Sequence, residues 1–349
     1  MTHLETLGWD GNWAAAFAAQ AASGWEAARV GVAHRGAYVV HTEAGEATAS
    51  LSGRVLHDGQ DAVVGDWVAL RRPPQGQARI EHVLPRRGAL FRLAAGSGHR
   101  SQVLAANVDL VLLLCGLDGD FNPRRVERAL VAVAESGARP VVVLNKADAC
   151  DALDERRRDM EAAAPGVPVL AISALTGAGV EPLAALITSG STVVLLGSSG
   201  VGKSTLANRL LGQETQATAE VRAHDSRGRH TTTHRALFVL PGGGVLIDTP
   251  GLRELRLLAE PEAASQAFTD LESLAAGCRF ADCGHAGEPG CAVRAAVEEG
   301  ALDAARLASY RKLQAELRHL ERRGDPRAMS AEKQRWKAIH KAARHRRPR

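Results

Sequence analysis

The nine residues Gly197-Ser198-Ser199-Gly200-Val201-Gly202-Lys203-Ser204-Thr205 limit what this chain can fold into more than any other stretch. They match the pattern Gly-x-x-x-x-Gly-Lys-Ser/Thr, whose glycines let successive backbone N–H groups turn inward toward phosphate oxygens. An apolar run, Thr192 to Leu196, precedes the motif, and Leu206 to Leu211 continues it as a helix. This order puts the phosphates at the positive end of a helix dipole. The motif therefore predicts a nucleoside triphosphate site, in which Lys203 reaches the β- and γ-phosphates and Ser204 binds Mg²⁺.

Length and composition are those of a globular protein with two or three domains. The chain has 349 residues, of which 45% are hydrophobic and 23% are charged. Apolar runs stay below the roughly 18 residues needed to span a bilayer, and the N-terminus lacks a basic region followed by an apolar one. We expect a cytoplasmic protein without a membrane partner.

Positive charge is concentrated at the C-terminal end of the chain. Residues 306–349 hold 15 Lys/Arg and 4 Asp/Glu, a net charge of +11, whereas the chain as a whole carries +4. A basic end on a slightly acidic body is typical of proteins that dock on nucleic acid, although a solvated helix face followed by a tail would look the same. Residues 301–323 have a helical period, and residues 333–349 combine eight Lys/Arg with Trp336, which suits RNA phosphates and stacking on a base.

Short apolar runs broken by Gly, Asp and Pro predict five strands between residues 28 and 92. The runs are 29–32, 37–42, 47–51, 62–70 and 78–84. Five strands in about sixty residues fit an oligonucleotide-binding (OB) barrel, although counting strands does not exclude another small barrel. Basic pairs at 71–72 and 86–87, with Arg54, would suit a surface that follows a nucleic-acid backbone; a purely structural barrel is the alternative. Before the barrel, Trp9, Trp13 and Trp25 are expected to anchor the N-terminal extension onto it.

From Val108 onward, strands alternate with helices. Apolar runs at 108–114, 141–144, 167–172, 192–196, 236–240 and 245–247 predict the strands, and Asn122-Pro123 opens a helix. Buried strands that alternate with helices predict a mostly parallel sheet covered on both faces.

Polar motifs follow two of these strands. In Asn145-Lys146-Ala147-Asp148, the carboxylate of Asp148 can accept two hydrogen bonds from the ring N–H and amine of guanine, a donor pair that adenine lacks. The next loop begins with Ser173 and Ala174 and offers backbone N–H groups to the guanine carbonyl. The sequence therefore predicts that the bound base is guanine.

The last strand leads into Asp248-Thr249-Pro250-Gly251. Asp248 would hold Mg²⁺ through water, and the Gly251 N–H would sense the γ-phosphate. Leu252 follows where many GTPases have a glutamine that orients water. Because leucine cannot position water, we expect slow hydrolysis unless a partner or another group accelerates it.

The order of these motifs is unusual. The guanine-reading motifs at 145–148 and 173–177 precede the phosphate loop, whereas small GTPases usually have the phosphate loop first, so the motifs are circularly permuted. In this order the chain resembles the ribosome small-subunit-dependent GTPase family, from about Ala28 to about His340. The resemblance implies GTP hydrolysis during late maturation of the small (30S) ribosomal subunit, with the barrel and the C-terminal region holding 16S-type rRNA.

The segment Arg227-Gly228-Arg229-His230-Thr231-Thr232-Thr233 closely matches a run of the same family. A threonine here can contact Mg²⁺ and the γ-phosphate only in the triphosphate state, which makes the segment a switch. We favour Thr232, although spacing does not separate it from Thr231 or Thr233. The resemblance also implies a catalytic role for His230; the alternative is an exposed or ribosome-contacting histidine.

Three cysteines and a histidine lie within fourteen residues: Cys278, Cys283, His285 and Cys291. Three thiolates and one imidazole form a closed tetrahedral zinc set, and the spacing matches the family's pattern. A site without an open position is structural. Cys115 and Cys150 are expected to be packing residues.

The sequence thus predicts an N-terminal extension (1–27), an OB-like barrel (28–98), a permuted P-loop GTPase domain (99–258) and a helical zinc domain with a basic tail (259–349). We expect a monomeric GTP hydrolase that uses GTP, Mg²⁺ and one Zn²⁺. The alternatives are a GTP-dependent factor acting on another RNA, an ATPase, and an RNA-binding scaffold whose nucleotide site is only structural.

Overall fold

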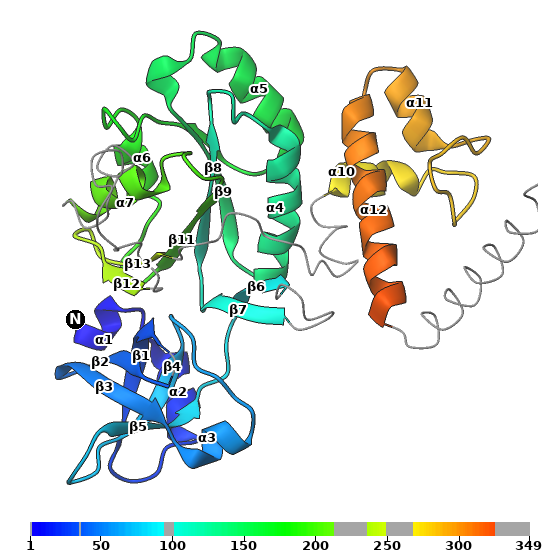
Figure 1. Cartoon of the computed structure of the whole chain (residues 1–349). Helices are drawn as coiled ribbons and strands as arrows, with labels where there is room; N and C mark the ends of the chain where they lie inside the picture. The colour runs from blue at the N-terminus through cyan, green and yellow to red at the C-terminus, as the bar shows by residue number, and fades with distance from the viewer. Residues whose placement is uncertain (1, 35, 94–100, 213–235, 249–267, 325–349) are drawn as a thin grey trace, which may run out of the picture. The chain divides into compact units, whose positions relative to one another are not determined.

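The computed structural model describes residues 2–34, 36–93, 101–212, 236–248 and 268–324. The chain forms two compact units, one from residues 1–92 and 102–258 and the other from residues 93–101 and 259–349 (Figure 1). Among the described helices, none is both long enough and apolar enough to cross a bilayer.

The N-terminal part of the first unit is a five-stranded closed barrel. Its strands are β1 (Trp25–Ala33), β2 (Tyr38–Thr42), β3 (Gly45–Leu51), β4 (Trp67–Arg71) and β5 (Ala78–Val83). The strands pair in the order β1-β2-β3-β5-β4, and β4 pairs back onto β1 to close the ring. Helix α3 (Gly53–His57) lies between β3 and β4. The barrel predicted from the sequence is therefore confirmed.

Two short helices at the N-terminus, α1 (His3–Thr6) and α2 (Gly11–Ala18), pack on this barrel. The rings of Trp9 and Trp13 lie 4.8 and 6.2 Å from that of Trp67 on β4. The expected anchoring role is confirmed for these two residues. Trp25 instead begins β1, with its ring 5.8 Å from that of His82.

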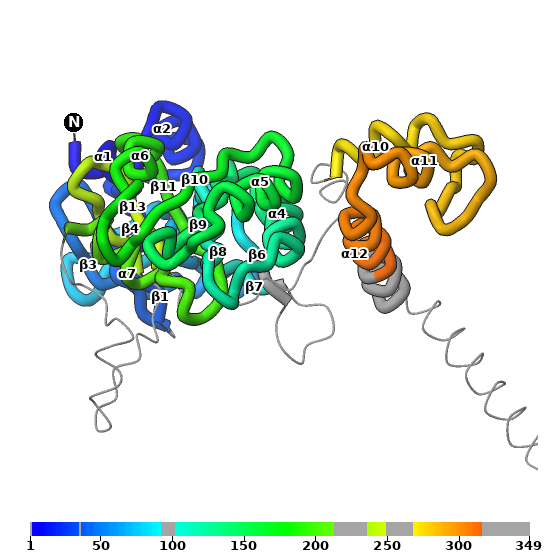
Figure 2. Tube along the Cα trace, turned by 90° about the horizontal axis from the view of Figure 1, so that it is seen from above, coloured from blue at the N-terminus to red at the C-terminus, as the bar shows by residue number. Residues whose placement is uncertain are grey.

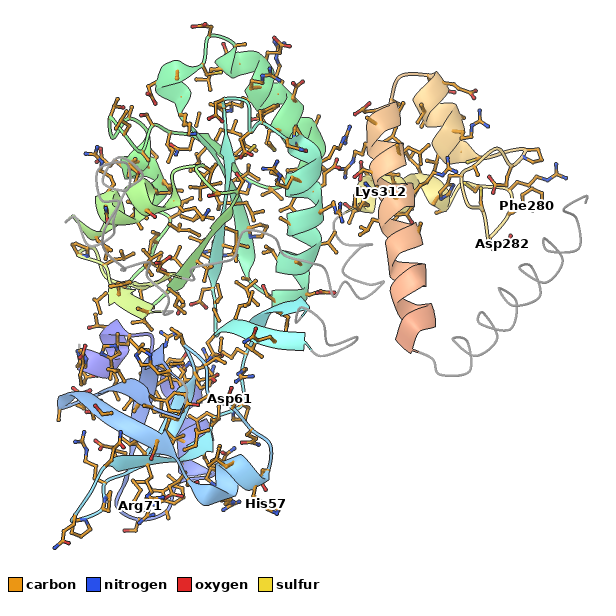
Figure 3. All side chains as sticks on the ribbon, viewed as in Figure 1. His57, Asp61, Arg71, Phe280, Asp282 and Lys312 are labelled. Carbon is orange, nitrogen blue, oxygen red and sulfur yellow. The ribbon has the colours of Figure 1, made fainter. Side chains whose placement is uncertain are left out.

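The basic pairs of the barrel are neutralised within it. Arg71 (labelled in Figure 3) pairs with Glu81 at 2.6 Å. The other pairs are Arg72–Glu26, Arg86–Asp66 and Arg87–Asp10. These four arginines therefore hold the barrel and its N-terminal helices together, which favours the structural interpretation of the basic pairs.

The rest of the first unit is the predicted α/β sheet. Its strands are β8 (Leu110–Gly116), β9 (Arg139–Asn145), β10 (Val169–Ala171), β11 (Thr192–Gly197), β12 (Ala236–Val239) and β13 (Val245–Asp248). Five of them run parallel in the order β10-β9-β8-β11-β13, and β12 joins antiparallel to β13.

Helices cover both faces of this sheet, as expected. On β8, Val111 and Leu113 face a core with α4 (Pro123–Ser136) and α5 (Leu153–Ala163). Their neighbours Leu110 and Leu112 face the opposite core, with α6 (Val180–Ala184) and α7 (Lys203–Leu211). Figure 2 shows the two helix pairs on opposite sides of the strands. Cys115 is buried in the first core, and Cys150 packs against it.

The sequence did not predict that barrel and sheet are joined by backbone pairing. Val32 of β1 pairs antiparallel with Ala236 of β12, so a single sheet of eleven strands runs through both parts. A two-stranded sheet of β6 (Ala89–Leu93) and β7 (Ser101–Ala106) lies between them in the chain.

The second unit contains α10 (Thr269–Ala275), α11 (Ala292–Glu298) and α12 (Ala304–Gly324). Phe268, Leu271, Val293, Leu307 and Leu313 form its buried core. Arg306 of α12 is buried, lies over the Phe268 ring and pairs with Asp270 of α10 at 2.5 Å. This pair ties α10 to α12.

Candidate nucleotide site and metal centre

The phosphate-loop motif connects β11 to α7, as the sequence predicts. Gly202 lies immediately before α7 and has φ +100°, in the left-handed region that favours glycine. A Cβ added there would lie 2.2 Å from Nδ2 of Asn145, so the position also needs the small size of glycine. Lys203 begins the helix, and its Nζ lies 2.7 Å from the Gly197 carbonyl and 2.5 Å from the Ser198 carbonyl. The ammonium group is therefore held over the loop.

Asn145, at the end of β9, joins the phosphate loop to the 173–177 loop. Its Nδ2 donates to the Val201 carbonyl at 2.8 Å, and its Oδ1 accepts from the Ala174 N–H at 2.9 Å. The side chain is only 3% exposed. Because both bonds are buried, this single amide fixes the spacing of two loops that lie far apart in sequence.

Asp148 lies exposed on a single 3₁₀ turn, Ala147–Ala149, just beyond Asn145. The preceding residue, Lys146, adopts a left-handed backbone with φ +69°. The Ala147 N–H donates to the Ile172 carbonyl at 3.0 Å, which holds this turn beside the end of β10. The turn that carries Asp148 therefore lies beside the start of the 173–177 loop.

The 173–177 loop is closed by its own hydrogen bonds. Buried Ser173 accepts from the Thr176 N–H through Oγ at 3.1 Å, and its carbonyl accepts from Gly177 N–H at 2.8 Å. Arg209, on α7, donates to the Leu175 carbonyl at 2.6 Å. This contact of Arg209 was not predictable from the sequence, because a single arginine on a helix gives no sign of which loop it reaches. Leu175 itself is 71% exposed at the loop tip.

Two predicted magnesium ligands reach the same edge of the sheet. Ser204 lies in the first turn of α7, and Asp248 is the last residue of β13. Because β13 runs parallel to β11, with Val194 opposite Ile247, Asp248 lies at the same end of the sheet as the phosphate loop. Hydroxyl and carboxylate oxygens are suitable Mg²⁺ ligands. The predictions for His230, Thr231, Thr232, Thr233, Gly251 and Leu252 lie outside the described residues.

Two carboxylates outside the predicted motifs also contact these loops. Asp118 and Asp120 follow β8, and they contact Lys146 and Ser198 respectively. The hydrogen bond with Lys146 lowers the pKa of the Asp118 carboxyl below its ordinary value. Polar residues directly after a strand were the signal that identified the other loops, and the same signal was available here.

In the second unit, the four expected zinc ligands come together. The ligand atoms of Cys278, Cys283, His285 and Cys291 lie within 4.8 Å of one another. Sγ of Cys278 is 3.9 Å from Sγ of Cys291 and 3.7 Å from Nδ1 of His285, which is 3.5 Å from Sγ of Cys291. A tetrahedral zinc with S and N ligands requires separations of about 3.5–3.8 Å. The three separations in the cluster are close to these values, so the cluster is compatible with a zinc ion.

Backbone geometry supports this cluster. Cys291 is the N-cap of α11, and its Sγ accepts from the Arg294 N–H at 3.4 Å. Glu288 closes the turn between His285 and Cys291, and hydrogen bonds from the backbone N–H groups of Glu288, Gly287 and Ala286 lower its pKa to about 2. Phe280 and Asp282, labelled in Figure 3, lie on the loop between the first two cysteines. The Glu288 carboxylate thus holds the segment between Cys283 and Cys291 in a tight turn.

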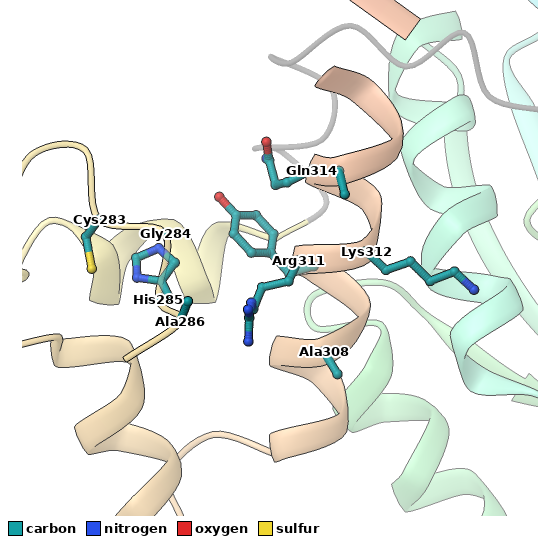
Figure 4. Close-up of a pocket in the computed structure, with 10 residues that line it drawn as sticks. Cys283, Gly284, His285, Ala286, Ala308, Arg311, Lys312 and Gln314 are labelled. Atoms are coloured by element: carbon teal, nitrogen blue, oxygen red, sulfur yellow. The ribbon is translucent and has the colours of Figure 1, made fainter. Parts of the chain in front are cut away.

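A pocket of about 540 Å³ lies beside the metal cluster (Figure 4). One wall is the Cys283–Ala286 segment, and the other is a stretch of α12 with Ala308, Arg311 and Gln314. The positive charge expected near the C-terminal end therefore begins next to the cluster.

The fold and these loops define a circularly permuted P-loop protein of the GTPase class, with an OB-like barrel and a Cys₃His centre. The sequence profile of the family described as RsgA GTPase matches residues 83–258. The chain belongs to this family, so the resemblance seen in the sequence is confirmed.

Full-length relatives carry the same description. The small ribosomal subunit biogenesis GTPase RsgA of Opitutus terrae is 47% identical over 98% of this chain and 97% of its own length. The protein with that name from Syntrophotalea carbinolica is 46% identical, over 97% and 96% of the two chains.

Solved structures agree with the fold. YjeQ from Thermotoga maritima matches with a TM-score of 0.64 and 29% identity, over 84% of this chain and 98% of its own. YloQ, described as a circularly permuted GTPase, matches with a TM-score of 0.61 and 23% identity, over 84% and 96% of the two chains, and supports the fold alone.

Proposed function

We propose that this protein is a GTPase that binds the small ribosomal subunit and assists its late maturation, hydrolysing GTP to GDP and phosphate faster when bound there. The observation that carries the proposal is the bridging side chain of Asn145. Its two buried hydrogen bonds join the phosphate loop to the loop beside Asp148, which gives one continuous site for a guanine nucleotide. The near full-length similarity to ribosomal subunit biogenesis GTPases supports the choice of partner.

Nucleotide binding divides among the loops. Asp148 accepts from the two N–H donors of guanine, and the backbone N–H groups after Ser173 face the guanine carbonyl. Lys203 and the N–H groups of the phosphate loop bind the phosphates at the start of α7. Ser204 and Asp248, with Thr232 as the third proposed ligand, would hold Mg²⁺, which neutralises charge on the β- and γ-phosphates when bound.

For hydrolysis, water attacks the γ-phosphate in line with the bond to the leaving GDP. Lys203 stabilises the charge that develops on the transferred group. We assign His230 to the orientation of water, because Leu252 lacks a hydrogen-bonding group, and the Gly251 N–H to the γ-phosphate. The ribosomal subunit would accelerate the reaction by ordering these groups.

We assign partner binding to the second unit and the basic C-terminal end, because the arginine pairs of the barrel are occupied within it. The net charge of +11 over residues 306–349 suits phosphates of 16S-type rRNA. The four-ligand cluster, with zinc bound, would hold the loop between Cys278 and Cys291 rigid for such contacts. We propose a monomer in the cytoplasm.

The decisive experiment measures GTP turnover with and without isolated small ribosomal subunits. We expect a low basal rate and a clear acceleration by small subunits, with no acceleration by large subunits. Lys203→Ala should abolish both rates and serves as the control for contaminating GTPases. Absence of stimulation, in folded protein with a full complement of zinc, would contradict the ribosomal role.

A further inference from the structure

The turn between β8 and α4 carries two carboxylates that lie against the nucleotide loops. We call residues 118–120 the acidic turn. It is held beside β9, because the Leu117 N–H donates to the Asn145 carbonyl at 2.9 Å. It also folds back tightly on the end of β8: a Cβ added to Gly116 would lie 2.5 Å from Oδ1 of Asp118. The acidic turn therefore has a defined position relative to the strand that carries the guanine-reading motif.

Asp120 contacts the phosphate loop. Its Oδ2 accepts a hydrogen bond from the hydroxyl of Ser198, the second residue of the loop motif. Its Oδ1 pairs with Arg125 of α4 at 2.6 Å. The Asp120 side chain is 25% exposed, so the contact is partly shielded from water. The arginine matters because a carboxylate beside bound phosphates would otherwise repel them.

Asp118 contacts the guanine-reading loop. Its Oδ2 lies 2.6 Å from Nζ of Lys146, and the two side chains are 43% and 33% exposed. Lys146 has a left-handed backbone immediately before the turn that carries Asp148. The pair therefore restrains the side chain next to the base-reading carboxylate. Because this ion pair is exposed to water, it should contribute less to nucleotide binding than the contact of Asp120 with Ser198.

The start of α4 does not account for these carboxylates. Asn122 is the N-cap of that helix, where its side chain accepts from the Arg125 N–H at 3.0 Å, and Pro123 occupies the first turn. The helix is thus capped independently of the acidic turn.

We infer that Asp118 and Asp120 are positioning residues for the nucleotide, with Asp120 fixing the phosphate loop and Asp118 fixing the base-reading loop. This inference rests on the proposed function. Together with Asn145, the acidic turn sets the separation between the loop that binds phosphates and the loop that binds the base. Its two ends act on different parts of the nucleotide, which a purely structural role would not produce.

The two residues should therefore differ in their effect on selectivity. Asp120→Ala frees the Ser198 hydroxyl and should weaken the binding of GTP and of ATP by the same factor. We expect about tenfold, the size of one charge-assisted hydrogen bond. Asp118→Ala should weaken GTP binding about two- to fivefold, as expected for an exposed ion pair, and should weaken ATP binding less, through the hydrogen bond that Asp118 accepts from the Asp120 N–H at 3.2 Å. The ratio of GTP to ATP affinity then falls only in the second variant.

The test is equilibrium binding of GTP, GDP and ATP to the full-length variants, with thermal melting to verify folding. Asp120→Asn keeps an acceptor for Ser198 and should bind within about threefold of the unsubstituted protein. Asp120→Ala combined with Ser198→Ala should be no weaker than Asp120→Ala alone, because both remove the same bond. Asp151→Ala, which changes an exposed carboxylate beyond Asp148, is the matched control and should change nothing.

Unchanged binding in both alanine variants, or fully additive effects of Asp120→Ala and Ser198→Ala, would overturn the inference. Equal affinity of the unsubstituted protein for GTP and ATP would instead overturn guanine specificity in the proposed function. In that case the comparison of Asp120 with Ser198 still decides the inference, because either nucleotide reports on the phosphate loop.

Discussion

Replacing Gly202 by alanine should weaken nucleotide binding by a factor that the structure allows us to calculate. At φ +100° an alanine is strained by about 1–3 kcal/mol. The new Cβ would lie 2.2 Å from Nδ2 of Asn145 and push that amide away from the Val201 carbonyl. The lost hydrogen bond costs about 1 kcal/mol. The sum is about 2–4 kcal/mol, so the loss in affinity can reach about 30- to 1000-fold when the free protein relaxes this strain and nucleotide binding restores it.

Titration of the protein with a fluorescent GDP analogue measures this loss directly. Gly137→Ala is the matched control: Gly137 also has a positive φ, +73°, but an added Cβ meets no atom within 4 Å. Gly137 ends α4, so the alanine variant should lower the free energy of unfolding by about 1 kcal/mol without changing GDP affinity. In a protein that already carries Asn145→Ala, Gly202→Ala should reduce GDP affinity by a smaller factor, because the amide that its Cβ would displace is absent. Binding of GDP by Gly202→Ala within threefold of the unsubstituted protein would refute the reasoning.

Three further predictions concern the base, the metal and the barrel. Asp148→Asn presents an N–H donor to a guanine donor, so GTP affinity should fall by about 5- to 150-fold and the preference for GTP over ATP should shrink. Competition binding measures both affinities. An unchanged preference would contradict the role of Asp148 in reading guanine. Cys283→Ser should lower the zinc content measured by native mass spectrometry and the melting temperature of the second unit, while GDP affinity stays the same. Full zinc occupancy in this variant would contradict the assignment of Cys283 as a zinc ligand. Arg29→Ala removes a guanidinium that is 1% exposed and donates to Thr192 Oγ1 at 2.7 Å and to the Gly65 and Leu7 carbonyls. Because three buried acceptors lose their donor, denaturant unfolding should show a loss of about 3–5 kcal/mol in the free energy of unfolding. A loss below about 1 kcal/mol would show that these acceptors find other hydrogen bonds.

Local patterns in the sequence were sufficient for the elements and for the motifs that follow them. The five barrel strands, the covered parallel sheet and the cysteine–histidine cluster each leave a periodic or spaced signature within a short stretch. The loop at Gly197–Thr205 and the turn at Asp148 were recognisable for the same reason, since each is a contiguous motif after a strand.

Contacts between distant residues were not predictable from such patterns. Nothing local to Asn145 shows that its amide spans two loops, and nothing near Arg71 or Arg86 shows that a carboxylate on another strand neutralises it. The pairing of β1 with β12 joins residues about two hundred positions apart in the chain, and pairing at that distance has no signature in either segment. The roles assigned to His230, Thr232 and Gly251 remain predictions.

Without the barrel, the antiparallel strand β12 would be an outermost strand of the sheet that carries the nucleotide loops. An outermost strand exposes unpaired N–H and C=O groups, which is a common starting point for aggregation between chains. Here β1 pairs with that edge at Ala236, and the closed barrel beyond it has no comparable free side. The barrel therefore covers the start of this edge at Ala236, and any fragment cut between barrel and sheet would have to shield β12 in some other way.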